Sequence, residues 1–235
     1  MSFQFDFPFA RRAFAEALLG IPVTLSVVLA AFLAGFPLGF LIARCRLRRT
    51  PVISQILTVY VSFARGTPVV VKILLFYSLL PPALEHAIRV LGLNFSIYDL
   101  NPIVYAFIIF GITSSATYSE IWRSALNGVD SGQYEAAVSV GLTPFQAYLE
   151  VVLPQALAIG APAFCSSTLS MLKGTSVVFL MAILDITGRA RLAAAMGYKY
   201  LEAYVVIFLV YLTVCGILEQ VFKLLEQRLV RFRAS

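Results

Sequence analysis

Residues 130–154, DSGQYEAAVSVGLTPFQAYLEVVLP, form an amphipathic insertion between strongly apolar segments of the chain. Asp130 is predicted to cap a first helix, and Gln133 stands at the spacing of a capping box. Gly141 is predicted to end this helix, because glycine most easily adopts the left-handed conformation of a helix C-terminus. Thr143 is the expected N-cap of a second helix, followed by a proline at the tolerated first position. The stretch therefore predicts two short helices at an angle, presenting a small surface outside a bilayer.

The composition of the chain is that of a membrane protein. Of its 235 residues, 60% are hydrophobic and 13% are charged, whereas soluble domains have about 25% charged residues. The net charge of +6 does not indicate nucleic-acid binding, because the arginines stand beside apolar segments, where cytoplasmic loops usually hold them. Three scattered cysteines lack the close spacing of a metal site and are predicted to be buried free thiols.

Five apolar segments are long enough to cross a hydrocarbon core of about 30 Å. We expect these spans over residues 18–43, 53–80, 102–121, 154–184 and 203–225. Residues 1–17 are predicted to form an interfacial segment, and residues 18–235 one all-α transmembrane domain. Four arginines follow the first span and two precede it, so the N-terminus is expected outside and residues 130–154 in the cytoplasm.

One group of basic residues opposes this topology. Arg189, Arg191 and Lys199 fall in the predicted external segment of residues 185–202. Asp185 and Glu202 flank that group and weaken the charge bias without reversing it.

Polar residues interrupt the second predicted span at Arg65-Gly66-Thr67-Pro68. Proline removes a backbone donor and glycine permits unusual torsions, so the helix is expected to kink or unwind here. Broken membrane helices expose backbone groups that form ligand sites. The alternative is a packing kink, with Arg65 reaching the interface.

The fourth predicted span is expected to be broken at Gly160, Pro162 and Lys173-Gly174. Lys173 is an ammonium in an apolar segment, and such charges usually face a cavity or a partner. A carboxylate ligand is its natural partner, and Glu120 in the third span is the main competitor within the chain. The hydroxyl groups of residues 113–119 either line a pathway or join helices by hydrogen bonds.

The insertion resembles the EAA signature of the permeases of ATP-binding-cassette (ABC) importers. Glu135-Ala136-Ala137, three residues, Gly141 and nine more residues lead to VVLP at residues 151–154, where the family has isoleucine at the first position. The resemblance implies a type I ABC importer permease fold with a coupling helix that docks on a separate ATPase subunit. The coupling residues it implies are Glu135, Ala136, Ala137, Gly141, Leu142 and Thr143.

Three further stretches, RGTP (65–68), YSEI (118–121) and LKGTS (172–176), resemble the polar amino acid permeases within that group. Carried over by position, the family's substrate-site residues are Thr67 and Lys173. The remaining predicted site residues lie beside them or in the third span: Gly66, Gly174, Thr175, Ser176 and Glu120. Many relatives that carry basic amino acids have aspartate where Gly174 stands, which argues against arginine or lysine as substrate. Residues 185–188 and 200–204 resemble members that carry cystine or related sulfur amino acids.

The chemistry of an enzyme is missing from the sequence. No G-x-x-x-x-G-K-[ST] pattern surrounds any lysine, so no phosphate-binding loop is predicted and ATP and Mg are expected on a partner ATPase. His86 is the single histidine, and no nucleophilic triad or zinc site can be built around it. We therefore predict no catalytic residue, no metal site and no cofactor in this chain.

The resemblance also implies a location and a set of partners. The location is the bacterial cytoplasmic (inner) membrane. The partners are an ABC ATPase subunit, an extracytoplasmic substrate-binding protein, a second permease chain (identical or homologous), an amino acid and membrane lipids. Two other hypotheses remain: a secondary carrier that uses Lys173 and Glu120 with an ion gradient, and a membrane-embedded assembly partner that tolerates changes at Thr67 and Lys173.

Overall fold

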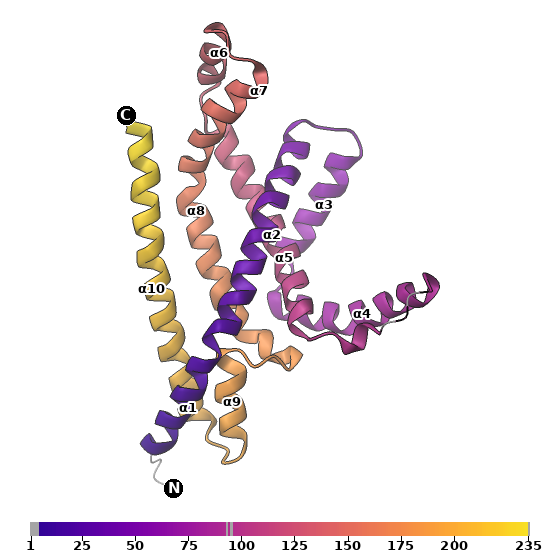
Figure 1. The fold of residues 1–235 in the computed structure, drawn as a ribbon, viewed down its shortest axis with the longest axis vertical. Helices are drawn as coiled ribbons and strands as arrows, with labels where there is room; N and C mark the ends of the chain where they lie inside the picture. Colours follow the sequence, from indigo (N-terminus) through magenta and orange to yellow (C-terminus); the bar gives the residue numbers. More distant parts are fainter. Residues whose placement is uncertain (1–4, 93, 95, 235) are drawn as a thin grey trace. The chain divides into compact units, whose positions relative to one another are not determined.

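The computed structural model describes residues 5–92, 94 and 96–234, with side chains to residue 227, and this part of the chain is helical without strands. Its elements are drawn in Figure 1. In chain order they are α1 (Phe7–Leu19), α2 (Ile21–Leu47), α3 (Ile53–Gly66), α4 (Val69–Val90), the 3₁₀ turn η1 (Ile97–Asp99), α5 (Ile103–Asn127), α6 (Ser131–Ser139), α7 (Pro144–Gln146), the π-helical turn η2 (Ala147–Val152), α8 (Leu153–Gly174), the 3₁₀ segment η3 (Thr175–Met181), α9 (Ile186–Ala195) and α10 (Tyr200–Ala234).

The chain divides into two compact units. The first unit comprises Met1–Phe32, Gly66–Ile112 and Met171–Gly216, and the second comprises Leu33–Arg65, Thr113–Ser170 and Ile217–Ser235. The boundaries fall inside α2, α5 and α10 and near the end of α8, so each of these helices contributes one part to each unit.

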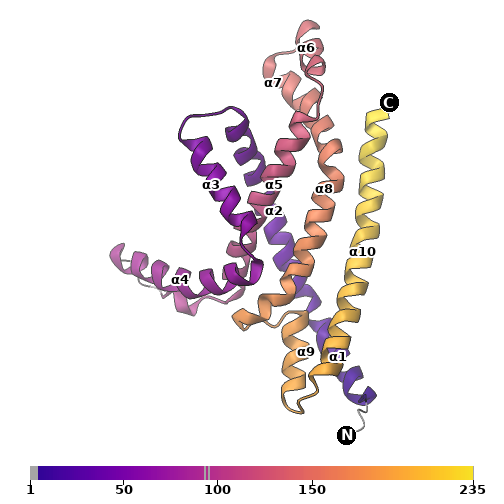
Figure 2. The same cartoon turned by 180° about the vertical axis from the view of Figure 1, so that it is seen from behind.

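Two apolar clusters form the core of the first unit. In one, Val27 of α2, Ile73 of α4 and Ile109 of α5 pack with Val178 and Met181 of η3. The other joins α1, α9 and α10 and is rich in alanine: Ala13, Ala17, Ala190, Ala194 and Ala203 are all fully buried. Small side chains let helix backbones approach closely, and Figure 2 shows α9 lying beside α1.

Gly20, between α1 and α2, lies in close contact with the backbone before α9. A Cβ atom at Gly20 would lie 2.4 Å from the backbone carbon of Asp185. The turn before α9 therefore rests directly on the start of α2, and only glycine fits there.

Aromatic rings fill the core of the second unit. The ring of Phe36 on α2 lies 4.9 Å from those of Trp122 and Phe164, and the Trp122 indole N–H donates to the Phe36 carbonyl at 3.1 Å. The hydroxyl groups of Tyr118 and Thr168 are 2.8 Å apart. These contacts join α2, α5 and α8 with the tilted and edge-on ring arrangements that aromatic pairs prefer.

The predicted all-α membrane fold is confirmed in its class. By length and composition, the described residues contain four candidate spans: Phe7–Leu47, Val69–Val90, Pro144–Met181 and Tyr200–Gln227. The segment that corresponds to the third predicted span, α5, is not among them. Its second half carries the hydroxyl-rich residues 113–119. The expected number of five crossings therefore stays a prediction.

Two predicted helix boundaries are wrong. Helix α4 passes through Pro81 and Pro82 to Val90, so it does not end at residue 80, the predicted end of the second span. The surface helix that the sequence allowed through Glu85 and Arg89 is the continuation of α4, and it includes His86. Helix α8 likewise passes through Gly160 and Pro162 without a break. A proline removes only one donor, and a membrane helix tolerates this loss where its other backbone bonds remain.

The charged residues near α9 are paired or buried. Arg189 contacts Glu16 of α1 at 3.3 Å, and Lys199 forms an ion pair with Asp6. Asp185, which was expected to offset their charge from a flanking position, is only 1% exposed. Two of the three basic residues that opposed the predicted topology are therefore paired with carboxylates of the N-terminal segment, and Arg191 lies over the Phe179 ring.

Candidate functional site

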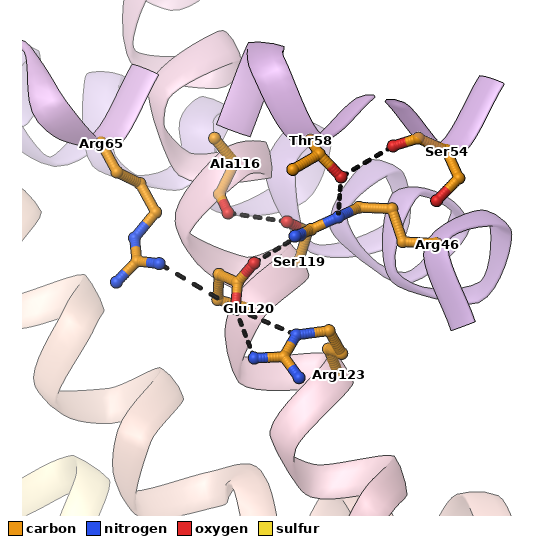
Figure 3. Close-up of polar contacts among 8 residues, drawn as sticks. All are labelled: Arg46, Ser54, Thr58, Arg65, Ala116, Ser119, Glu120 and Arg123. Carbon is orange, nitrogen blue, oxygen red and sulfur yellow. Dashed lines mark hydrogen bonds and ion pairs between the residues drawn. The ribbon is translucent and has the colours of Figure 1, made fainter. Parts of the chain in front are cut away.

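Glu120 of α5 is the centre of a charge cluster within the second unit, shown in Figure 3. Its carboxylate forms an ion pair with Arg46 at the end of α2 and accepts two hydrogen bonds from Arg123, at 2.8 and 3.1 Å. Arg65, at the end of α3, lies 4.0 Å from the same carboxylate. One acidic side chain thus forms ion pairs with arginines of three helices, α2, α3 and α5.

The cluster extends to α3 by a further contact. Arg46 donates from Nε to the Thr58 hydroxyl at 3.2 Å, and Thr58 donates to the Ser54 carbonyl at 2.7 Å (Figure 3). The sequence identified Glu120 but neither Arg46 nor Arg123 as its partner. The spacing of Arg123, three residues along the same helix, was the available signal.

The second unit contains α6 and, after the turn at Gly141, the three-residue helix α7, which continues through η2 into α8. The second predicted short helix is thus the first turn of a longer helical segment, while the predicted caps of both helices form. The Asp130 side chain accepts from the Gly132 N–H at 2.7 Å and caps α6. The Gln133 side chain accepts a hydrogen bond from Gln155 instead of completing a capping box. The capping box forms one helix later, between Thr143 and Gln146.

The turn between α6 and α7 is a Schellman motif. The Gly141 N–H donates to the Val138 carbonyl at 3.0 Å, and the Leu142 N–H donates to the Ala137 carbonyl at 3.2 Å. Gly141 has φ = +97°, a backbone conformation that glycine adopts without strain. The predicted role of Gly141 as the end of the first helix is therefore confirmed.

The residues of this pair differ in exposure. Glu135, Ala136, Gly141 and Thr143 are exposed, whereas Ala137 is buried and Leu142 is half-buried. Large apolar side chains also face outward, with Val140 82% exposed and Phe145 71% exposed. Exposed apolar side chains of this kind, grouped on one surface, mark an interaction site.

The chain is interrupted at Thr67-Pro68, as the sequence predicts. Helix α3 ends at Gly66, and α4 begins at Val69 with no side-chain cap. No described heavy atom lies within 4 Å of where a Gly66 Cβ would be. The break between α3 and α4 is therefore bordered by open space at Gly66.

The second predicted stretch changes from α-helix to 3₁₀ helix after Gly174. Lys173 is exposed and forms no ion pair with any described carboxylate. Thr175 is fully buried; its hydroxyl donates to the Leu172 carbonyl at 2.7 Å and lies 3.4 Å from the Tyr211 hydroxyl. Ser176 is half-buried.

The first unit brings the two stretches to one apolar cluster. Val69, the first residue after the break at Thr67-Pro68, packs in the same cluster as Val177 and Val178, which follow Ser176. The segments that follow the two stretches, the start of α4 and η3, therefore pack against each other. Glu120 belongs to the other unit, where it is surrounded by arginines.

The sequence analysis missed Lys72, which is 4% exposed and lies one turn after Pro68 on α4. A charged group inside an apolar membrane helix is by default a functional candidate, and this signal was available. The three cysteines are free, as predicted, but they are half-buried and not fully buried.

Comparison with known protein families identifies the family of the chain. The family described as "Binding-protein-dependent transport system inner membrane component" matches residues 35–231. The chain belongs to this family. The matched region includes α6, α7 and all of the predicted substrate-site residues.

Members of this family in bacteria have closely similar sequences. The L-cystine transport system permease protein TcyL of Bacillus subtilis (strain 168) is 36% identical over 210 residues, covering 89% of this chain and 85% of that protein. The arginine transport system permease protein ArtQ of the same organism is 29% identical over 210 residues, covering 89% and 90%. The predicted resemblance to amino acid ABC permeases is confirmed.

Solved structures agree with the sequence relatives. A structure titled "Crystal structure of an amino acid ABC transporter with histidines" matches with a TM-score of 0.78 and 27% identity, covering 96% of this chain and 100% of that one. An inward-facing MetNI methionine ABC transporter matches with a TM-score of 0.65 and 15% identity, covering 95% and 97%, which shows a shared fold.

Proposed function

We propose that the chain is the permease subunit of an ABC importer that moves a polar amino acid inward across the bacterial cytoplasmic membrane. The observation that carries this proposal is the exposed helix pair α6–α7 with its glycine turn, in a chain of this transport family. The chain has no phosphate-binding loop of its own, and the ABC permeases that it resembles are transport subunits whose ATPase is a separate chain. Energy must therefore enter through a contact with that chain.

The exposed side of α6–α7 is the expected docking surface for the ATPase. Glu135, Ala136, Gly141 and Thr143 are accessible there, and Val140 supplies apolar surface. The Schellman turn fixes the angle of the pair, so that a push on either helix moves both. Two permease chains would enclose the path, and an external binding protein would deliver the substrate.

Transport follows if the ATPase states prefer different spacings of these helix pairs. ATP, with its Mg, binds the partner ATPase and supplies the closing motion. Closure then shifts the five spans toward an outward-open state, and hydrolysis returns them, because differential affinity for two states is what moves a population. In this proposal, Thr67 and Lys173 contact the substrate, with Gly66, Gly174, Thr175 and Ser176 shaping the site.

The exposed lysine suits a ligand with a carboxylate. Lys173 has no ion-pair partner among the described carboxylates, and an ammonium in an apolar setting is stabilised by such a partner. Every amino acid supplies an α-carboxylate. The finer proposal, cystine or a related sulfur amino acid, is supported by the 36% identity to a permease named for L-cystine transport.

Site-directed cross-linking tests the docking surface. In a chain with its three cysteines replaced by serine, Val140→Cys should cross-link to the co-expressed ATPase subunit, because Val140 is 82% exposed on the helix pair. Met196→Cys is the matched control: it is 98% exposed but follows α9, in the segment predicted to be external. Cross-linking from Met196 and not from Val140 would reverse the proposed orientation.

Reconstitution separates the remaining hypotheses. Purified permease with its ATPase and binding protein should take up the amino acid only with ATP, whereas a secondary carrier would transport without the ATPase. A binding screen of the cognate binding protein against amino acids identifies the substrate. Preference for an amino acid without sulfur would reject cystine and leave the importer function intact.

A further inference from the structure

A groove of about 690 Å³ opens in the second unit beside the end of α2. Its polar lining includes Arg44 and Arg48, one turn apart on α2, together with Asn127, Tyr134 and Tyr148. Its apolar walls come from Leu47, Leu126, Pro144, Phe145 and Val152. The lining therefore contains two cations and no carboxylate.

The arginines of this region fall into two groups. Arg46, Arg65 and Arg123 surround Glu120. Arg44 and Arg48 line the groove and form no ion pair with any carboxylate that the structure describes. Arg44 instead lies over the Tyr148 ring, 4.8 Å from its centre. The charge of the groove is thus not compensated by any carboxylate among the described residues, and the groove favours an anion.

The groove also lies at a defined depth. Helix α2 is apolar from Ile21 to Ala43 and becomes basic at Arg44, so its last turn marks the boundary between hydrocarbon and headgroups. A ligand here meets both guanidinium groups and exposed apolar side chains, since Leu47 is 37% and Phe145 71% exposed. That combination matches a phospholipid better than a soluble anion, because only the lipid fills the apolar walls.

We propose that this groove binds the headgroup of an anionic phospholipid, with Arg44 and Arg48 contacting its phosphate. Guanidinium groups bind phosphate through paired, charge-assisted hydrogen bonds, and basic pockets at the cytoplasmic ends of membrane helices recognise acidic lipids. Tyr134 and Phe145 line the same groove from the helix pair. A bound headgroup therefore fills the space between the end of α2 and the proposed ATPase-docking surface.

The test measures lipid binding to the purified full-length chain in detergent, by native mass spectrometry during titration with phosphatidylglycerol or phosphatidylcholine. We expect phosphatidylglycerol to bind at least tenfold more tightly. Arg48→Gln should weaken that binding three- to tenfold, and Arg44→Gln with Arg48→Gln should abolish the preference. Arg49→Gln is the matched control, because Arg49 is an exposed neighbour that does not line the groove; it should change the affinity less than twofold.

Several results would overturn the proposal. Equal losses from Arg49→Gln and Arg48→Gln would mean that general positive charge attracts the lipid, without a site. Displacement of the lipid by millimolar inorganic phosphate would identify free phosphate as the ligand. If lipid binding is unchanged in the double variant while its affinity for the ATPase subunit falls, an acidic segment of that protein occupies the groove. Because Arg48 is exposed, its variant is expected to fold, and its elution on size exclusion checks this.

Discussion

Replacing Glu120 with glutamine should strongly destabilise the second unit. The side chains of Glu120 and Arg46 are 17% and 14% exposed, so the substitution leaves a largely buried guanidinium without its counter-charge, at a cost of about 3 kcal/mol. Arg123 and Arg65 are 41% and 51% exposed, and solvent screening limits each of their pairs to about 0.2–1 kcal/mol. We therefore expect a total loss of about 3.4–5 kcal/mol, which is more than a hundredfold in the equilibrium between folded and unfolded protein.

The single tryptophan provides the assay. Trp122 lies two residues from Glu120, in the aromatic core of the same unit. Its fluorescence during unfolding in mixed micelles of dodecyl maltoside and increasing SDS reports the stability of this unit. The variants Arg46→Gln, Arg123→Gln and Arg65→Gln should show losses in that order, the first the largest.

A double-mutant cycle completes the test. Glu120→Gln combined with Arg46→Gln should cost less than the sum of the single changes, because residues in direct contact are coupled. A loss below about 1 kcal/mol for Glu120→Gln, well under that of a broken buried pair, would refute the reasoning. A larger loss of stability from Arg65→Gln than from Arg46→Gln would also refute it, because Arg65 is the most exposed of the three arginines and the farthest from Glu120.

Substitutions at Gly141, Gly20 and Asp185 test three local features. Gly141→Val should uncouple ATP hydrolysis from transport while leaving membrane insertion intact. No described atom lies within 4 Å of the Cβ position of Gly141, so the substitution destabilises the turn only through the backbone strain of φ = +97°, about 1–3 kcal/mol. Gly141→Asn should have a smaller effect on transport, and normal uptake by the valine variant would contradict this prediction. Gly20→Ala should destabilise the protein by about 1–3 kcal/mol in thermal unfolding, because its Cβ would clash with the backbone of Asp185 at 2.4 Å. Gly216→Ala is the control: this glycine lies in open space within α10, and alanine there should stabilise the protein by about 0.5–1 kcal/mol. Equal effects of the two substitutions would show that the contact at Gly20 does not cause the loss of stability. Burial raises the pKa of Asp185, so its contribution to stability is present at low pH and is lost as pH rises through that raised pKa. Asp185 is the N-cap of α9, and Asp185→Asn keeps an N-cap. This substitution should flatten the fall in stability against unfolding above about pH 4, and an unchanged profile would exclude Asp185 as its source.

The helix pair shows how much local sequence predicts. Asp130, Gly141 and Thr143 act on backbone groups within four residues of themselves, so their roles as caps and turn can be read directly from spacing. The break at Thr67-Pro68 was predictable for the same reason, because proline and glycine change the backbone where they stand. The all-helical membrane class followed from composition alone.

The wrong helix boundaries come from the same kind of local signal. Pro81, Pro82, Gly160 and Pro162 carry the same local signals as Pro68, yet the helices continue through them. A Cβ atom at Gly160 would lie 2.8 Å from the ring of Phe164 on the same helix and 3.1 Å from the side chain of Ala125 on α5. The approach to α5 is a contact with another helix that the neighbours of Gly160 in sequence do not reveal. Packing of this kind outweighs a local preference of about 1 kcal/mol for glycine.

The sequence by itself determined a helical membrane protein of the ABC permease type, with a capped and turned helix pair and two polar interruptions. The tertiary structure decided which charges meet. Glu120 pairs with Arg46 across 74 residues and Lys199 with Asp6 across 193, while Arg44 and Arg48 are left to line a groove. Caps and turns depend on atoms a few bonds apart, whereas the pairing or burial of a charge depends on segments that only folding brings together.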